Sequence, residues 1–388
     1  MGVRFSGNLG HGRSQKSPPV ARESSPIQKQ APEGEHVRLA RALEKALLVH
    51  RCCPRGINPN EVLIGPSVIQ IPFFMRGGSQ IQDLQSREVD LAREMGLEGG
   101  VRITNLPGRP GYAAAEIPRQ ERRVPHVREL GPPEEESYPS IALGQTLAGE
   151  PYRVELDQLP HLLVAGRSGS GKSFLLRSIV HQLTALYRVK DLAVVIIDGK
   201  GLADFEGFRG EAHLLDDDAY CSDPNSALEY LEQNLLEDHL PEKRELFKRE
   251  SRKAAEGTGR GISSLRDLYR YAGAEVKSRP LVVVLDEFAE IAASTDAARR
   301  LNEAVARFAS AGRAVGAHLI LATQRPSADI ITGAIKQNCA RLALSVSSRV
   351  DSRVILDERG AEDLLGNGDM LFKAAYGPAL RLQGYDVS

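Results

Sequence analysis

The sequence predicts an α/β fold with a parallel, doubly wound sheet in the C-terminal two thirds of the chain. Short apolar runs alternate there with helical stretches, and we expect buried strands at residues 161–166, 193–198, 281–286, 318–323 and 341–347. Four of these strands end in a polar or glycine-rich feature at the carboxyl end: a glycine-rich segment, Asp198, Asp286 and Gln324. Open α/β sheets bind ligands at that edge, so the same pattern predicts a site.

The chain begins with a segment that we expect to be a flexible, disordered tail, residues 1–36. It is rich in Gly, Ser, Pro, Gln and Arg and lacks apolar periodicity, so it cannot bury enough surface to offset the entropy lost on ordering. Its first thirty residues carry five basic side chains and one acidic one, Glu23. A weak contact with DNA or anionic lipid stays open, and a solvated linker is the favoured interpretation.

A small α+β domain is expected over residues 37–130. Apolar residues recur at helical spacing over 37–49, and a second helix is expected at 87–95. Short β-rich pieces are expected at 61–71, 101–105 and 112–117. Two prolines and three glutamates then follow, which predicts a linker over 131–137 ahead of the main domain, residues 138–388.

The glycine-rich segment has the full pattern of a P-loop that binds a nucleoside triphosphate. Its residues are Gly166, Arg167, Ser168, Gly169, Ser170, Gly171, Lys172 and Ser173. Glycines at this spacing let backbone N–H groups turn toward a polyphosphate, Lys172 reaches the β- and γ-phosphates, and the Ser173 hydroxyl holds Mg²⁺. Apolar residues at helical spacing follow Ser173, so the helix dipole faces the phosphates.

Two carboxylates end the strand expected at 281–286. In a P-loop ATPase the first, Asp286, helps to organise Mg²⁺ and its waters. The second, Glu287, is the candidate that polarises the attacking water. The sequence therefore predicts ATP hydrolysis with Mg²⁺ as well as ATP binding.

The strand expected at 318–323 is flanked by two further candidates. Gln324 follows it and can reach a γ-phosphate or the attacking water. Arg313 precedes it, at the end of a helix, and is poorly placed for its own P-loop. An arginine in that position can enter the site of a neighbouring subunit and stabilise transition-state charge there, which would make hydrolysis depend on assembly.

Composition excludes several classes of protein. The net charge is −1, so any nucleic-acid surface must be local. The four cysteines form no CxxC pair and the histidines have no metal-ligand spacing, which argues against zinc and disulfides. The apolar runs are far too short to span a bilayer and the N-terminus has no signal-like apolar segment, so we expect a cytoplasmic protein.

Taken together, these motifs resemble the motor region of the FtsK/SpoIIIE family, bacterial translocases of double-stranded DNA. The P-loop and the Asp286-Glu287 pair are similar to the two nucleotide motifs of the family. Further segments that resemble the family pattern lie at residues 138–151, 322–327, 346–353 and 364–371, and the region 37–128 is similar to the small domain before the motor.

The resemblance implies a RecA-like P-loop NTPase that assembles as a homohexamer around double-stranded DNA. Lys172 would bind the phosphates, and Ser173 would hold Mg²⁺. Asp286 would help to hold Mg²⁺, and Glu287 would orient the attacking water. Gln324 would sense the γ-phosphate, and Arg313 would stabilise the transition state in the site of a neighbouring subunit. Arg325, Arg349 and Arg353 match positions where the family carries basic residues that face DNA. Full-length members also have a membrane-spanning region and a winged-helix module, neither of which we find, so we expect a stand-alone motor.

Two other functions stay open at this point. A coupling ATPase of a secretion or conjugation machine would move protein or nucleoprotein cargo with the same motifs. An ATP-binding scaffold that does not translocate would not need Glu287 or Arg313. Stimulation of hydrolysis by DNA separates the first alternative from the DNA translocase.

Overall fold

The structure is a computed structural model that describes most of the chain after the predicted tail. The described residues are 34–50, 56–75, 77–78, 80–106, 108–133, 138–159, 161–200, 203–272, 276–292, 294–328, 331–374 and 377–387. The predicted tail lies outside them except for its last three residues, and so do residues 134–137 of the predicted linker.

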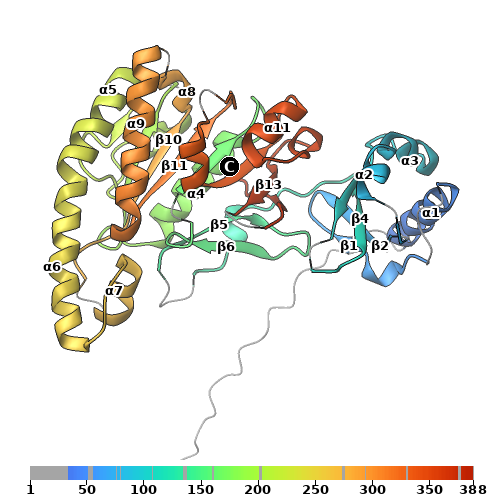
Figure 1. The fold of residues 1–388 in the computed structure, drawn as a ribbon, viewed down its shortest axis with the longest axis horizontal. Coiled ribbons are helices and arrows are strands. Elements are labelled where there is room, and N and C mark those ends of the chain that lie inside the picture. Colours follow the sequence, from blue (N-terminus) through green and yellow to red (C-terminus); the bar gives the residue numbers. More distant parts are fainter. Residues whose placement is uncertain are drawn as a thin grey trace, which may run out of the picture.

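A small antiparallel sheet covered by helices forms the N-terminal part of the described chain (Figure 1). Its strands run in the order β1 (Leu63–Ile64), β2 (Val68–Phe74), β4 (Tyr112–Pro118) and β3 (Arg102–Asn105). Helices α1 (Glu35–Val49), α2 (Ile81–Gln85) and α3 (Glu88–Met95) bury apolar residues against the sheet. The predicted α+β composition is confirmed, but the piece expected at 61–71 is two strands joined by a turn that begins at Gly65.

Among the described residues the larger sheet has ten strands, and its centre is parallel as predicted. The parallel strands lie in the order β12 (Ala340–Leu344), β7 (His161–Ala165), β11 (Ala317–Thr323), β10 (Leu281–Asp286), β8 (Ala193–Asp198) and β9 (Tyr220–Cys221). An antiparallel extension that the alternation of strands and helices did not predict continues from β12 through β13 (Asp369–Lys373), β14 (Leu380–Gln383), β5 (Ser140–Gln145) and β6 (Pro151–Glu155).

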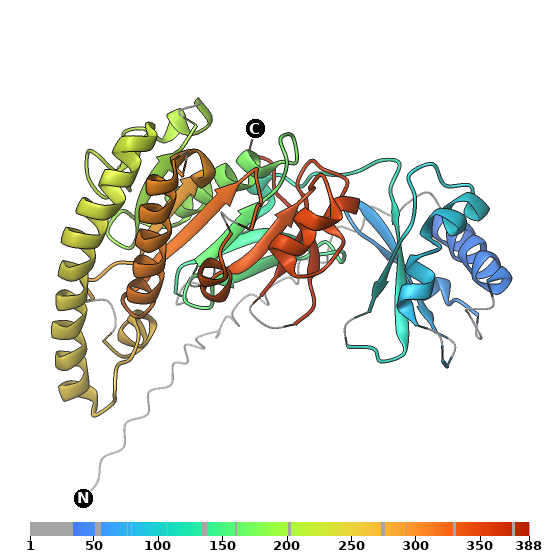
Figure 2. The same cartoon turned by 45° about the horizontal axis from the view of Figure 1, so that its top comes forward.

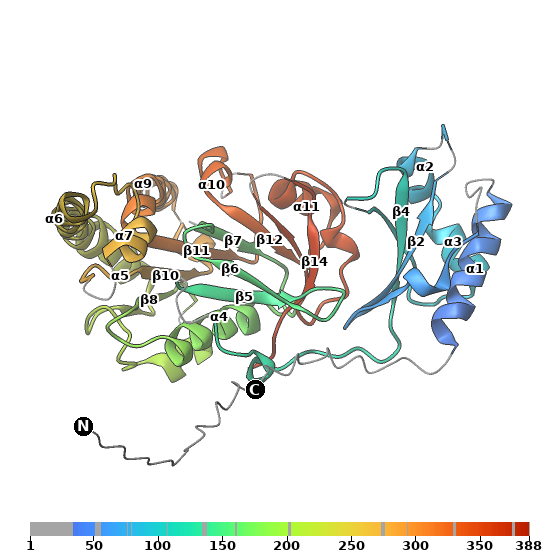
Figure 3. The ribbon, with the colours of Figure 1, turned by 90° about the horizontal axis from the view of Figure 1, so that it is seen from below.

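Helices cover both faces of this sheet, so it is doubly wound as expected. Figure 3 shows α4 (Lys172–Leu186) on one side and α10 (Gly333–Asn338) and α11 (Arg349–Leu356) on the other. Successive strand residues point to opposite faces, so Val282 and Val283 belong to two separate apolar clusters. Burial on both faces explains why the central strands read as unbroken apolar runs.

The segment between β9 and β10 is helical. It contains α5 (Pro224–Glu229), a π-helical stretch (Tyr230–His239), α6 (Leu240–Thr258) and α7 (Leu265–Ala272). Figure 2 shows α6 and α9 (Thr295–Gly312) running side by side at the far end from the small sheet. None of the helices that the structure describes is long and apolar enough to cross a membrane.

A buried ion-pair network joins the small sheet to the large one. Arg381 on β14 contacts Glu116 on β4 at 2.5 Å and Asp369 on β13 at 2.6 Å, and Arg102 on β3 contacts Glu116 at 3.1 Å. The three residues Glu116, Asp369 and Arg381 are at most 6% exposed. Residues 126–130, which we expected in the small domain, pack instead on the large sheet, where Val127 lies against Ala142 and Tyr385. Strand β14 therefore contributes the buried arginine that links the two sheets.

Candidate nucleotide-binding site

The P-loop lies between β7 and α4, as the sequence predicts. Gly169 and Gly171 have φ values of 75° and 103°, which L side chains rarely adopt. A Cβ added to Gly171 would lie 2.6 Å from the backbone nitrogen of Gly368. Glycine at this position therefore permits both the turn and its close contact with the loop before β13.

The first turn of α4 offers backbone N–H groups to an anion. Gly171 caps the helix without a side-chain hydrogen bond. Arg167 is held away from this turn, because its backbone N donates to Ser345 O at 2.9 Å and its Nε to Ser345 Oγ at 3.2 Å. Unsatisfied amides and the helix dipole together favour phosphate at this end of the helix.

Lys172 and Asp286 form a buried ion pair next to the loop. The Nζ of Lys172 donates to Oδ1 of Asp286, and both residues are at most 3% exposed. Asp286 Oδ1 also accepts from Glu287 N at 2.9 Å, whereas Asp286 Oδ2 is buried and has no hydrogen-bond partner. A buried carboxylate oxygen that lacks a donor fits a Mg²⁺ ion or one of its waters.

No cluster of three or more His, Cys, Asp or Glu residues is placed to hold a metal ion in the described part of the chain. A Mg²⁺ site does not require such a cluster, because Mg²⁺ in phosphoryl-transfer sites uses one or two carboxylates and takes its other ligands from phosphates and waters. Ser173 and Asp286 remain the residues that would hold the ion.

Glu287 is buried at the end of β10 and is surrounded by donors. Thr323 Oγ1 donates to Glu287 Oε1 at 2.9 Å, and Gln324 N lies 3.0 Å from both carboxylate oxygens. Lys200 Nζ lies 3.4 Å from Oε2. Sequence reasoning did not single out Thr323, although it lies in the family-like segment 322–327, or Lys200, which lies in no motif. The available signal was the position of Thr323 at the end of β11 and of Lys200 just after β8.

Asp198 completes the group of carboxylates at this edge of the sheet. It pairs in register with Asp286 across β8 and β10, and its Oδ2 has no hydrogen-bond partner. Burial raises the pKa of Asp198 above its ordinary value, and the nearby charge of Asp286 raises it further. A ligand cation would relieve this repulsion.

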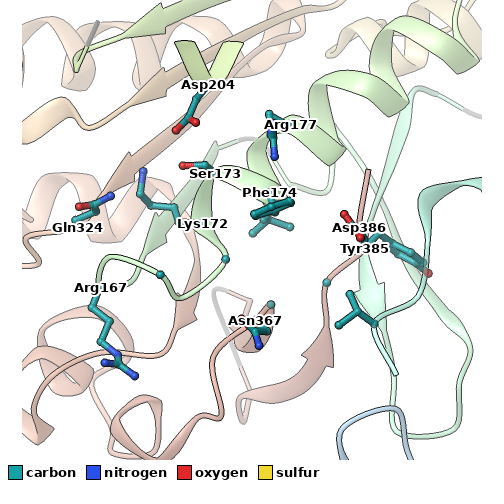
Figure 4. Close-up of a pocket in the computed structure, with 16 residues that line it drawn as sticks. Arg167, Lys172, Ser173, Phe174, Arg177, Asp204, Gln324, Asn367, Tyr385 and Asp386 are labelled. Atoms are coloured by element: carbon teal, nitrogen blue, oxygen red, sulfur yellow. The ribbon is translucent and has the colours of Figure 1, made fainter. Parts of the chain in front are cut away.

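A cavity of about 360 Å³ extends from the P-loop past the first turn of α4. Figure 4 shows Lys172 and Gln324 at one end and Tyr385 and Asp386 at the other, with Phe174 and Arg177 between them. The Arg177 guanidinium lies 4.6 Å from the centre of the Phe174 ring. The phosphate end is therefore polar, and the far end offers aromatic surface of the kind on which a nucleobase stacks.

Arg313 lies at the opposite edge of the sheet from its own P-loop. It starts a short 3-10 helix (Arg313–Val315) just before the amino end of β11, whereas the P-loop follows the carboxyl end of β7, a parallel neighbour of β11. Its side chain is exposed. The placement agrees with the expectation that Arg313 is poorly placed for its own P-loop.

Arg325, Arg349 and Arg353, named here the three outward arginines, are all exposed. Arg325 follows β11, and the other two lie on α11, which follows β12. The side chains of Arg325 and Arg349 are 76% and 70% exposed, with carboxylates no closer than 3.9 Å and 3.7 Å. Pairs this long hold the two arginines weakly, because the guanidinium side of each pair is mostly exposed to solvent.

Comparison with known proteins agrees with these motifs. The profile of the FtsK/SpoIIIE family matches residues 133–328, about half of the chain. The DNA translocase FtsK of Pasteurella multocida (strain Pm70) is 34% identical over 339 residues, which cover 81% of this chain and 35% of that protein. The chain thus spans about a third of the length of this relative.

Solved structures with a similar fold include a conjugation coupling protein and a secretion ATPase. The conjugation coupling protein TcpA of pCW3, in its monomer form with ATPγS, has a TM-score of 0.55 at 20% identity over 91% of this chain and 95% of its own. The cytoplasmic domain of the type VII secretion ATPase EccC from Thermomonospora curvata has a TM-score of 0.53 at 25% identity, over 66% of this chain and 30% of its own. These similarities support the P-loop ATPase fold.

Proposed function

The chain belongs to the FtsK/SpoIIIE family, and from this membership and the site geometry we propose that it is an ATP-driven translocase of double-stranded DNA that acts as a homohexameric ring. Its P-loop, buried carboxylates and elongated cavity support the binding and hydrolysis of ATP. The observation that carries the proposal is the convergence of Lys172, Asp286, Glu287 and Gln324 at one edge of the sheet.

The chemistry follows from where these side chains lie. Lys172 exchanges its contact with Asp286 for the β- and γ-phosphates when ATP binds, because phosphate oxygens offer it more acceptors. Asp286 and Ser173 are then the residues that would hold Mg²⁺, and the ion would supply positive charge that neutralises the phosphates. Glu287 then orients the attacking water, and Gln324 contacts the γ-phosphate from the end of β11.

Assembly completes the site. Arg313 is exposed and lies away from its own P-loop, so it reaches phosphate only in the site of a neighbouring subunit. An arginine supplied in trans stabilises the charge that develops on the transferred phosphoryl group. A closed ring gives every site such a neighbour, which is why we propose a homohexamer rather than an isolated motor.

DNA binding is assigned to the three outward arginines. They lie on loops and a helix that follow the carboxyl ends of β11 and β12, on either side of the P-loop strand β7. Their exposure lets them contact phosphates without sequence preference, as a translocase requires. The net charge of −1 means that this attraction is local.

The experiment that tests the proposal measures the ATPase rate with and without long linear duplex DNA. Stimulation by duplex DNA supports the translocase. The alternative is a coupling ATPase that moves protein or nucleoprotein, which the fold similarity to the secretion ATPase EccC favours. An ATPase that ignores duplex DNA, with ATP binding intact, would place that alternative first.

A further inference from the structure

A second cavity lies at the opposite edge of the large sheet from the P-loop. Its volume is about 710 Å³, and it is lined in part by Ala193 and Leu281, the first residues of β8 and β10. Both strands have six residues. At a rise of about 3.3 Å per residue, their other ends lie roughly 16 Å away. The cavity is therefore separate from the nucleotide-binding site.

One wall of this cavity comes from α6 and the end of the π-helical stretch before it. The residues His239, Lys243, Leu246 and Arg249 line the cavity, and their spacing of three or four residues places them on one face of the helix. The facing wall comes from residues 277–279, just before β10. Both walls carry basic side chains toward the same space.

Lys243 is a buried cation in the wall of this cavity. The residue is 6% exposed, and its ammonium donates to Ser278 Oγ at 3.4 Å and to the carbonyl oxygen of Arg279. Both acceptors are neutral, so neither balances the positive charge. An ammonium has three N–H groups, and these two contacts leave one of them for a ligand.

Arg279 adds a second cation with neutral partners. Its guanidinium donates to the carbonyl oxygens of Val189 and Leu192. Burial, with a further contribution from the charge of Arg279, lowers the pKa of Lys243 to about 7. A bound anion would supply the negative charge that both cations lack and would stabilise the protonated form of Lys243.

The carboxylates near the cavity do not cancel its positive charge. Glu250 accepts the two backbone N–H groups of residues 277–278, at 2.9 and 3.1 Å. Glu245 pairs with Lys248 at 2.6 Å, and Glu242 is exposed. The lining contains four Lys and Arg residues and two Glu residues, so its net charge is positive.

We propose that this cavity is a second ligand site, which binds a small phosphorylated molecule. A phosphate group carries a charge of about −2 near neutral pH and three acceptor oxygens, which suit the ammonium of Lys243 and the exposed cations Arg249 and Lys277. A carboxylate brings only about half of that charge. Leu215 and Leu246 offer apolar surface to the rest of the molecule, and the volume lies in the range of small-molecule sites.

Titration calorimetry with pyrophosphate tests this site. The host is the full chain with Lys172→Ala, without Mg²⁺ or nucleotide, because its P-loop lacks the cation that binds phosphate. Addition of Lys243→Met should weaken the binding of pyrophosphate roughly tenfold or more, since charge-assisted hydrogen bonds are the stronger ones. Methionine keeps the apolar stem of the lysine and removes the charge.

Three companion variants in the same host separate the site from general attraction between charges. Lys253→Met is the matched control, because Lys253 is an exposed lysine on α6 that does not line the cavity, and it should leave the affinity within about twofold of the host. Arg249→Gln and Lys277→Gln each remove an exposed cation from the lining and should weaken binding roughly threefold. These two variants carry the test if thermal melting shows that Lys243→Met does not fold.

Citrate, which offers carboxylates alone, should bind the host at least about tenfold more weakly than pyrophosphate. Equal affinity for the two anions would overturn the assignment to phosphate. Equal binding of pyrophosphate by the host and by folded Lys243→Met, or an equal loss in Lys253→Met, would overturn the site itself. The measurement uses neither ATP nor DNA, so its outcome is independent of the proposed translocase function.

Discussion

Replacement of Arg381 by methionine tests the connection between the two sheets. Arg381 is 6% exposed and contacts two carboxylates, Glu116 on the small sheet and Asp369 on the large one. Methionine preserves most of the apolar volume and leaves both carboxylates buried. In the variant Glu116 still has its ion pair with Arg102 at 3.1 Å, and Asp369 still accepts a hydrogen bond from Leu365 N at 2.8 Å. The negative charge of each carboxylate is therefore only partly balanced.

The expected loss of stability follows from this burial. Removal of one partner from a buried ion pair typically costs about 3–5 kcal/mol, because a charge remains without its counterion. The triple variant Arg381→Met, Glu116→Gln and Asp369→Asn should recover at least half of that loss, since no charged carboxylate is then left buried on either side. Arg93→Met is the control, because the Arg93–Asp90 pair is exposed and should contribute nothing measurable.

Urea unfolding followed by far-UV circular dichroism measures these differences; the chain has no tryptophan to serve as a fluorescent probe. Burial alone would raise the pKa of Glu116, but Arg381 and Arg102 hold it below the ordinary value of 4.5. The stabilisation by Glu116 is therefore complete above pH 4.5 and is lost as pH falls through the lowered pKa. The difference in the free energy of unfolding between the wild type and Glu116→Gln should therefore become smaller as the pH falls through the lowered pKa of Glu116. A loss below about 1 kcal/mol for Arg381→Met at neutral pH would refute the reasoning.

The remaining predictions concern hydrolysis and binding. Lys172→Ala should remove most ATP hydrolysis, while Glu287→Gln should keep ATP binding and stall turnover; hydrolysis by the Gln variant at the wild-type rate would move the water activator elsewhere. Arg313→Ala subunits should bind ATP without hydrolysing it, and mixing them with Lys172→Ala subunits should restore partial activity; formed rings with no rescue at any ratio would exclude a residue in trans. Substitution of each of the three outward arginines by alanine should weaken DNA binding equally across sequences and reduce the slope of log K against log salt by roughly one unit; unchanged affinity in all three would favour protein cargo.

The parts of the fold that depend on local pattern could be predicted from the sequence. The expected strand at 281–286 matches β10 at both ends, because a β-branched run ended by two carboxylates has clear limits. The antiparallel extension was not predicted from the alternation of strands and helices. Strands such as β14 (Leu380–Gln383) are short, carry buried charged residues and depend on partners far away in the chain.

The candidate site likewise contains residues that local sequence pattern predicts and residues that only the fold brings together. Every P-loop residue was predicted, because the motif is local and its glycines are required by backbone geometry. Thr323 and Lys200 were not, since a threonine at a strand end and a lysine after a glycine are common, and only the register of β8, β10 and β11 brings them to Glu287. The cavity extends from Gln324 to Tyr385, and its lining residues come from segments far apart in the sequence, so local pattern could not predict its shape.

Displacement of a third strand from a duplex tests the central claim most directly, because it reports movement along DNA rather than hydrolysis. The wild-type protein with ATP and Mg²⁺ should release a labelled third strand from the far end of a linear duplex, and Glu287→Gln should bind the same duplex without releasing it. Release should depend on the length of duplex ahead of the triplex and should fail with a non-hydrolysable analogue. ATP hydrolysis that duplex DNA stimulates while the triplex stays intact would contradict translocation.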